Sequence, residues 1–284
     1  MRQRVISAII FVIAMLGGVF GGATTFFLLF LGITAGSLWE FHGLMFRPEG
    51  NHLLFRRLAG TVLGCLPFIT VAHTTLDLFT GGDATIYEFA NGPLLLAMMG
   101  MLLLIFLLFS VELFLGSHQP FTNLGHYLLG VVYLGIPFAL LISLSYWQDH
   151  YAPLRVLGLL LLTWTNDTMA YLVGSKIGKT PFFSRISPNK TWEGTLGGVV
   201  CTSLVAALFS NWIPAFTFYQ WMLLAAVVAI FGTLGDLVES MLKRSLHVKD
   251  SGSILPGHGG FLDRFDSFIF VLPFAWLALM ILEG

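Results

Sequence analysis

The residue types best suited to chemistry gather near the carboxyl end of the chain. Four of them follow one another at intervals of three, one and three positions: Asp236, Glu239, Ser240 and Lys243. In a helix these four side chains share one face, because positions three and four apart are neighbours. Asp263 and Asp266 are likewise three positions apart. Several carboxylates close together suit a hard cation such as magnesium, which takes oxygen ligands and is often shared with substrate phosphates.

Each of these features also has a purely structural interpretation. Asp263 can be the N-cap of a final helix, with Asp266 in its first turn near the positive end of the helix dipole. His258 on its own is a loop histidine. Pro256-Gly257 and Gly259-Gly260 predict a turn whose backbone amides are open to an anion, although loops are rich in glycine in any case.

A second group of polar residues begins inside an apolar run, at Asp167. An ionisable residue there is costly, so Asp167 is a candidate for function unless a hydrogen bond gives it a structural role. Further on, residues 187–194 read Ser-Pro-Asn-Lys-Thr-Trp-Glu-Gly. Lys190 and Thr191 are suited to phosphate contact. Glu193 can orient Lys190 or a water molecule on a metal ion.

The chain that positions these residues has the composition of a membrane protein. Of its 284 residues 56% are hydrophobic and 10% are charged, and its mean hydropathy of +0.85 excludes a water-soluble domain. The fold class predicted is therefore an all-α polytopic membrane protein with about nine transmembrane helices. Their apolar windows lie near residues 5–21, 23–39, 58–76, 94–115, 124–145, 155–174, 195–211, 218–235 and 266–282.

The first two windows form one charge-free run over residues 5–39. As a single helix the run would reach roughly 50 Å, against about 30 Å of hydrocarbon. It must therefore turn back, and residues 17–22 contain four glycines that permit this, or that form a close helix contact. Cys65 and Cys201 lie in apolar runs and are predicted to be core residues, while Glu112 in the fourth window has no predicted role beyond helix pairing.

The distribution of positive charge predicts the topology. With a cytoplasmic N-terminus, nine spans place the loops 40–57, 116–123, 175–194 and 236–265 on the cytoplasmic side. These loops and the N-terminus hold every Lys and Arg except Arg155, which satisfies the positive-inside rule. Residues 77–88, with three acids and no base, fit an external loop. By the same rule three of the basic residues near the carboxyl end can be interfacial anchors rather than phosphate ligands: Lys243, Arg244 and Lys249.

A longer pattern connects the polar residues. The last polar stretch contains Ser240-x-x-Lys243-Arg244, Lys249-Asp250, Pro256-Gly257-His258-Gly259-Gly260 and Asp263-Arg264-x-Asp266. In order and in spacing it resembles the signature of the phosphatidate cytidylyltransferases, the CDP-diacylglycerol synthase family. A second block, with Asp167, Tyr171, Gly174 and residues 187–194, resembles the less stringent motif of the same family. The first 160 residues resemble the family only in being a run of helices.

The resemblance implies a membrane enzyme that converts CTP and phosphatidic acid to CDP-diacylglycerol and pyrophosphate. It implies a divalent metal, usually magnesium, with room for a second cation such as K⁺. By matching positions, the metal ligands are Asp236, Asp263 and Asp266.

The same matching gives each polar residue a role. The catalytic residues implied are Asp236, Lys243, Arg244, Asp263, Arg264 and Asp266. The substrate-binding residues implied are Asp167, Ser187, Lys190, Thr191, Glu193, Ser240, Lys249, Asp250, His258, Gly259 and Gly260. Asn189 stands where the family also commonly has a basic residue.

The expected setting follows from these roles. We expect one continuous membrane domain in the inner (plasma) membrane, with N-terminal helices in residues 1–150, a catalytic region in residues 151–284 and catalytic loops at the cytoplasmic face. CTP, phosphatidic acid and the bilayer are the expected partners. No nucleic acid is expected, and a homodimer is compatible with the sequence.

Other functional classes fit the sequence less well. A transporter would place its polar residues near the midplane of broken helices, whereas here they gather in end loops. A CDP-alcohol phosphotransferase would carry an Asp-Gly-x-x-Ala-Arg element, which the sequence lacks. A CTP-dependent lipid kinase is the nearest alternative. It would release CDP, whereas a CDP-diacylglycerol synthase releases pyrophosphate.

Overall fold

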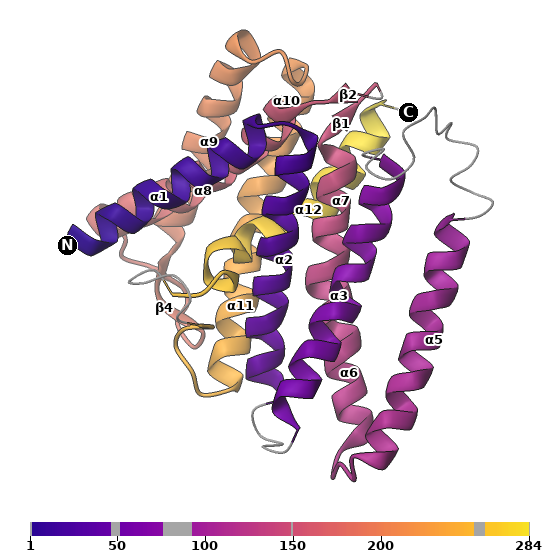
Figure 1. The fold of residues 1–284 in the computed structure, drawn as a ribbon. Helices are drawn as coiled ribbons and strands as arrows, with labels where there is room; N and C mark the ends of the chain where they lie inside the picture. The colour runs from indigo at the N-terminus through magenta and orange to yellow at the C-terminus, as the bar shows by residue number, and fades with distance from the viewer. Residues whose placement is uncertain (1, 47–51, 76–92, 149, 253–258, 284) are drawn as a thin grey trace. The chain divides into compact units, whose positions relative to one another are not determined.

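The computed structural model describes residues 2–46, 52–75, 93–148, 150–252 and 259–283. Helices account for most of this length (Figure 1). They are α1 (Arg2–Phe20), α2 (Ala23–Met45), α3 (Leu53–Thr75), α5 (Pro93–Phe114), α6 (Pro120–Gly130), η2 (Val131–Gly135), α7 (Ile136–Leu144), α8 (Pro153–Ile177), α9 (Trp192–Trp212), α10 (Phe218–Val227), η3 (Val228–Gly232), α11 (Thr233–Ser245) and α12 (Leu262–Glu283). The π-helical segments η2 and η3 join their neighbours into continuous helical runs.

Two short antiparallel ribbons interrupt the helices. Strand β1 (Tyr146–Trp147) pairs with β2 (His150–Tyr151), and β3 (Pro181–Phe183) pairs with β4 (Ser187–Thr191). In the second ribbon Pro181 lies opposite Thr191 and Phe183 lies opposite Ser187.

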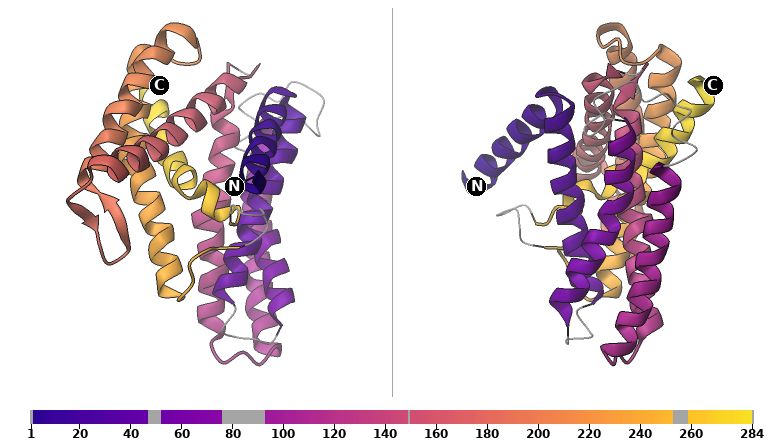
Figure 2. Two further views of the ribbon diagram at one scale, coloured as in Figure 1. Left: turned by 90° about the vertical axis from the view of Figure 1, so that its left-hand side faces the viewer. Right: turned by 45° about the vertical axis from the view of Figure 1, so that its right-hand side comes forward.

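Among the described residues, eight helical runs are long and apolar enough to cross a membrane, which confirms the all-α polytopic class. A helix suits lipid because it satisfies its own backbone hydrogen bonds. The first predicted span differs from the others, since the apolar stretch described in α1 is the shorter segment Ile9–Phe20. Helix α1 is inclined away from α2 in Figure 1 and in the right-hand view of Figure 2.

The predicted reversal between the first two windows is confirmed. Helix α1 ends at Phe20 and α2 begins at Ala23, with Gly22 between them at φ 112°, a conformation that favours glycine. The other predicted use of these glycines is present too. A Cβ at Gly18 would overlap the side chain of Leu29, so α1 and α2 approach closely there.

The described residues form two compact units. Unit 1 comprises Met1–Tyr151 and Ser251–Leu262, and unit 2 comprises Ala152–Asp250 and Asp263–Gly284. The segment Ser251–Leu262 is thus grouped with the N-terminal helices in unit 1.

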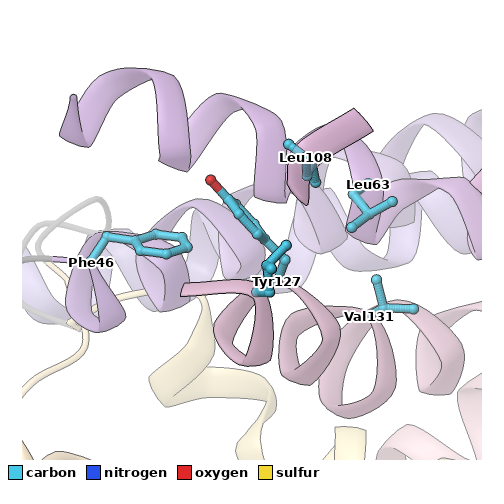
Figure 3. Packing of buried hydrophobic residues seen from close by; sticks show 6 residues of the cluster. Phe46, Leu63, Leu108, Tyr127 and Val131 are labelled. Atoms are coloured by element: carbon cyan, nitrogen blue, oxygen red, sulfur yellow. The ribbon is translucent and has the colours of Figure 1, made fainter. Parts of the chain in front are cut away.

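Unit 1 is built around α2, α3 and the run from α6 to α7. A Cβ at Gly135 would clash with the carbonyl oxygen of Gly64, so the backbones of η2 and α3 are in direct contact. One core cluster of this unit contains the buried residues Phe46, Leu63, Leu108, Leu124, Tyr127 and Val131. Figure 3 shows the Tyr127 ring among these apolar side chains, with its hydroxyl group at one end.

A buried ion pair lies beside this core. Arg56 of α3 and Glu112 of α5 are each 1% exposed, and two hydrogen bonds of 2.9 Å join the guanidinium to the carboxylate. Asn123 Nδ2 and the Tyr127 hydroxyl also donate to Glu112, at 3.1 and 3.4 Å. The helix pairing expected of Glu112 is therefore seen, with partners on α3 and α6.

The predicted loop over residues 40–57 needs correction. Helix α2 continues to Met45 and α3 begins at Leu53, so Glu40 and Arg56 lie inside helices. The predicted apolar windows stop at the charged residues Glu40 and Arg57, so they are shorter than the helices themselves. A charged residue can nevertheless stay in a buried helix when another part of the chain pairs with it, as Glu112 does with Arg56.

Unit 2 packs α8 along α9 and places α11 beside α12. A Cβ at Gly194 of α9 would come within 2.6 Å of the Ala170 carbonyl oxygen in α8. Arg155, near the start of α8, forms an ion pair with Glu283 at the end of α12. Gln220 of α10 donates to the same carboxylate at 3.0 Å. These contacts hold in place the helices that carry the polar residues.

Candidate active site

One face of α11 carries the predicted polar residues. The helix runs through Ser245, so Asp236, Ser240 and Lys243 lie on neighbouring turns, as the spacing predicted. Ser240 Oγ donates to Asp236 Oδ1 at 3.3 Å. Gly235 lets this helix approach α12, because a Cβ there would lie 2.8 Å from the carbonyl oxygen of Asp266.

Lys243 connects α11 to the start of α12. Its Nζ atom donates to Asp263 Oδ1 at 2.7 Å and forms a second ion pair with Glu239, one turn earlier on α11. The side chains of Lys243 and Asp263 are 14% and 9% exposed, whereas Glu239 is fully buried. Helix α12 begins at Leu262, so Asp263 lies in its first turn and is not its N-cap. The N-cap interpretation of Asp263 is therefore wrong.

Lys190 of β4 reaches the same helix. Its Nζ atom lies 2.7 Å from Asp236 Oδ2 and 3.4 Å from the carbonyl oxygen of Thr233. The Lys190 and Asp236 side chains are 24% and 35% exposed. Residues 46 positions apart thus form a pair that a ligand can reach.

A third group joins α8 to α12. Ser267 Oγ donates to Asp167 Oδ1 at 3.3 Å, and the Ser267 backbone N–H donates to Asp266 Oδ1 at 2.8 Å. Asp167 and Asp236 are close enough to Asp266 to interact with it electrostatically. Carboxylates from three helices therefore lie in one region of unit 2.

The ribbon β3–β4 is held by the start of α9. Thr191 is the N-cap of α9, and its Oγ1 atom accepts from the Gly194 N–H at 3.2 Å. Glu193 accepts hydrogen bonds from the backbone N–H groups of Lys179 and Thr180, at 3.1 and 3.2 Å. Glu193 thus fixes the turn into β3, whereas Lys190 is paired with Asp236.

The remaining predicted residues are distributed around these contacts. Arg244, Lys249, Asp250 and Arg264 are exposed. Ser187 is half-buried at the start of β4. Gly259 has φ 81°, and Gly260 is buried in unit 1. His258 lies outside the described residues.

Comparison with known proteins shows the family of this chain. The model of the cytidylyltransferase family matches residues 2–282. The chain belongs to the cytidylyltransferase family. A phosphatidate cytidylyltransferase of Bacillus subtilis (strain 168) is 32% identical over 280 residues, which is 98% of this chain and 97% of that protein.

Shorter and more similar matches occur in staphylococci. Phosphatidate cytidylyltransferases of Staphylococcus haemolyticus (strain JCSC1435) and Staphylococcus aureus (strain COL) are each 44% identical over 170 residues. The matched residues are 59% of this chain and 64% of each relative. The family match spans the N-terminal helices as well, which the sequence motifs alone did not cover.

The predicted magnesium site of this cytidylyltransferase family member can be tested against its contacts. The donor chemistry fits, because Asp236, Asp263 and Asp266 offer the carboxylate oxygens that magnesium prefers. Two of these carboxylates are paired with lysines, Asp236 with Lys190 and Asp263 with Lys243. Within the described part of the chain, no group of three acidic, histidine or cysteine side chains is placed to hold a metal ion. Magnesium therefore stays a prediction.

Sequence reasoning missed several residues that shape this region. Thr233 and Ser267 contact Lys190 and Asp167, and both are next to or within one turn of a predicted acid. Glu239 was recognised as part of the α11 face but was given no role. Its position four residues before Lys243 was the available signal for an ion pair.

Proposed function

We propose that this chain transfers the cytidylyl group of CTP to phosphatidic acid, giving CDP-diacylglycerol and pyrophosphate in phospholipid synthesis. The observation that carries the proposal is the full-length match to a relative named phosphatidate cytidylyltransferase. The contacts in unit 2 support it, since they bring basic side chains and partly exposed carboxylates together on membrane helices.

The reaction does not require the protein to form a covalent bond with either substrate. A phosphate oxygen of phosphatidic acid attacks the α-phosphorus of CTP, a new P–O bond forms, and the bond to the β-phosphate oxygen breaks as pyrophosphate leaves. Two anions must approach each other, so alignment and charge neutralisation dominate the barrier. The lipid phosphate is itself the nucleophile, so no protein nucleophile is required. Because a phosphate monoester is already largely ionised near neutral pH, a strong general base is not required either.

The lysines can supply the positive charge that neutralises the two anions. Lys190 pairs with Asp236, and Lys243 pairs with Asp263 and Glu239. A lysine ammonium is a mobile point charge that also binds phosphate. We infer that both ammonium groups contact substrate phosphates when CTP and phosphatidic acid bind. Arg244, Lys249 and Arg264 add exposed positive charge close by in sequence.

The reaction is tested directly with labelled substrate. Purified protein in detergent or vesicles receives CTP labelled at the α-phosphate together with phosphatidic acid, and label should move into a lipid as pyrophosphate is released. A matched incubation with a free lipid alcohol is the control. Release of CDP in that control, without transfer to phosphatidic acid, would identify a lipid kinase and overturn the proposal.

We also propose that the protein lies in the inner (plasma) membrane with its N-terminus, the β3–β4 ribbon and α11 at the cytoplasmic face. The charge asymmetry of the sequence supports this orientation. Cysteines introduced at Lys179 or Lys249 should resist a membrane-impermeant reagent in intact cells and react after the cells are opened. Labelling in intact cells would reverse the topology.

The other expected partners stay predictions. A second cation, K⁺, would need oxygen ligands beside the carboxylates, and added K⁺ should raise the rate of transfer if it binds there. A homodimer would show in the mass of the purified protein in detergent. No nucleic acid partner is expected, because the proposed reaction involves none.

A further inference from the structure

A buried carboxylate in unit 1 has no role in the chemistry above. Glu40 lies in α2, is 4% exposed and faces the segment Ser251–Leu262. Its Oε2 atom accepts a hydrogen bond from the backbone N–H of Leu262 at 3.0 Å and one from Ser251 Oγ at 3.3 Å. The positive charge of Arg57 is near enough to interact with it. Glu40 therefore binds both ends of this segment.

Two glycines of the segment make room for the carboxylate. A Cβ at Gly252 or at Gly260 would clash with the carboxyl group of Glu40. Neither of these two glycines has a positive φ, so the reason for glycine is space and not backbone conformation. The Glu40 carboxyl group thus occupies the space beside both glycines.

A second contact lies one turn earlier on α2. The ring of Phe261 covers Gly36, where a Cβ would come within 2.6 Å of the ring. Gly36 and Glu40 are four positions apart, so they lie on the same face of the helix. An apolar contact and a charged one together dock the segment on α2.

The hydrogen bond from the Leu262 N–H to Glu40 lies at the start of helix α12. Leu262 is the first residue of α12, and its N–H is one of the four that a helix leaves without an internal acceptor. A carboxylate at this position also interacts favourably with the positive end of the helix dipole. The next residue is Asp263, the partner of Lys243.

We propose that Glu40 is a positioning residue for cytidylyl transfer: by holding Ser251 and Leu262, it sets the start of α12 and the placement of Asp263 and Arg264. The inference rests on the function proposed above. It assigns a role in the reaction to an N-terminal helix that carries none of the residues of the sequence signature.

The first experiment measures docking and turnover together. In Glu40→Ala the Leu262 amide should exchange with solvent faster, and kcat should fall by roughly 10- to 100-fold, because small displacements of reacting groups lower the rate by such factors. The KM values for CTP and phosphatidic acid should stay unchanged, since the substrate contacts remain. Glu40→Gln keeps the size of the side chain and one acceptor oxygen. Its Leu262 amide exchange and its kcat should therefore change less than those of Glu40→Ala.

A second buried glutamate provides the control. Glu112 belongs to the same unit, and Glu112→Gln should lower the unfolding temperature while the folded protein keeps its kcat. Glu40→Gln showing that same pattern, or a kcat loss with Leu262 protected as in the wild type, overturns the positioning role. Amide exchange does not depend on substrate identity. If the wild type transfers nothing to phosphatidic acid, the proposed function fails and the docking result still stands.

A double substitution tests whether the glycine and the carboxylate act at one contact. Gly260→Ala should displace the Glu40 carboxylate and lower kcat by a similar factor. In Glu40→Ala/Gly260→Ala the clash is gone, so the double variant should be no slower than Glu40→Ala alone. Additive losses in kcat would show independent effects and would contradict the proposal.

Discussion

The two units of this protein each place an ion pair among apolar helices, but the pairs are built differently. Arg56 and Glu112 in unit 1 are 1% exposed and joined by two parallel hydrogen bonds. Lys190 and Asp236 in unit 2 are 24% and 35% exposed and meet through one lysine nitrogen.

The difference separates a structural pair from one that can exchange partners. Every oxygen of Glu112 has donors from α3 and α6, and the rigid fork of an arginine matches a carboxylate in one geometry. A lysine is a flexible point charge, so Lys190 can leave Asp236 for a phosphate without disturbing the helices. The accessible pairs are therefore the ones to associate with catalysis, and the closed pair with stability.

The largest effect should come from breaking the closed pair. Glu112→Ala leaves Arg56 buried without its counter-charge, and removing one partner of a buried pair typically destabilises a protein by about 3–5 kcal/mol. Thermal unfolding in detergent measures this loss. Asn123→Ala, which removes a single neutral donor, should have a smaller effect. An unfolding temperature equal to that of the wild type would mean that the pair does not hold α3 to α5.

Asp263→Asn should affect activity rather than stability. Lys243 keeps its ion pair with Glu239 in this variant, so the protein should purify folded. A neutral amide binds magnesium far more weakly than a carboxylate does, so transfer should fall by roughly 100-fold or more. Magnesium titrations of the wild type, Asp263→Asn and Asp266→Asn, each beside its unfolding temperature, measure this. Near-normal turnover at ordinary magnesium would rule out a metal role for these carboxylates.

Removing one basic side chain from the site should have an intermediate effect on activity. Lys190→Ala, Lys243→Ala and Arg244→Ala should each raise the requirement for CTP or phosphatidic acid, or slow turnover, by about 1.5–3 kcal/mol per lost charge-assisted contact. Membrane insertion should not change. Steady-state kinetics at several concentrations of each substrate give the answer. Three kinetically normal variants would leave interfacial anchoring as the whole explanation of these charges.

The smallest effect distinguishes a helix cap from a phosphate ligand. Thr191→Ala removes the N-cap of α9 and should cost about 1 kcal/mol of stability, whereas Thr191→Ser should restore it. If Thr191 only caps the helix, the folded Thr191→Ala protein keeps its KM for CTP. A raised KM in the alanine variant that serine corrects would assign the hydroxyl to substrate as well.

Local patterns predicted the parts of this structure that depend on local physics. Helix length and hydropathy gave the spans, and the spacing of Asp236 and Lys243 gave the polar face of α11. The pairing of Lys190 with Asp236 depends on two elements meeting in space, which no local pattern encodes. Glu40 was missed for the same reason, because its partners lie more than 200 positions later in the chain. The short ribbon β3–β4 carries no periodic signal long enough to predict.

The π-helical segment η3 has a consequence for how the length of this chain can vary. It occupies Val228–Gly232, directly before α11, and such segments fit one residue more into a turn than an α-helix does. Deleting one residue here would leave an ordinary α-helical turn with α11 in its present register. Adding one would rotate α11 by about 100° as a block and carry Asp236 away from Lys190. Related chains can therefore exchange the apolar side chains of η3 for one another or lack one of its residues, while a single-residue insertion between Val228 and Gly232 should be absent from every active one.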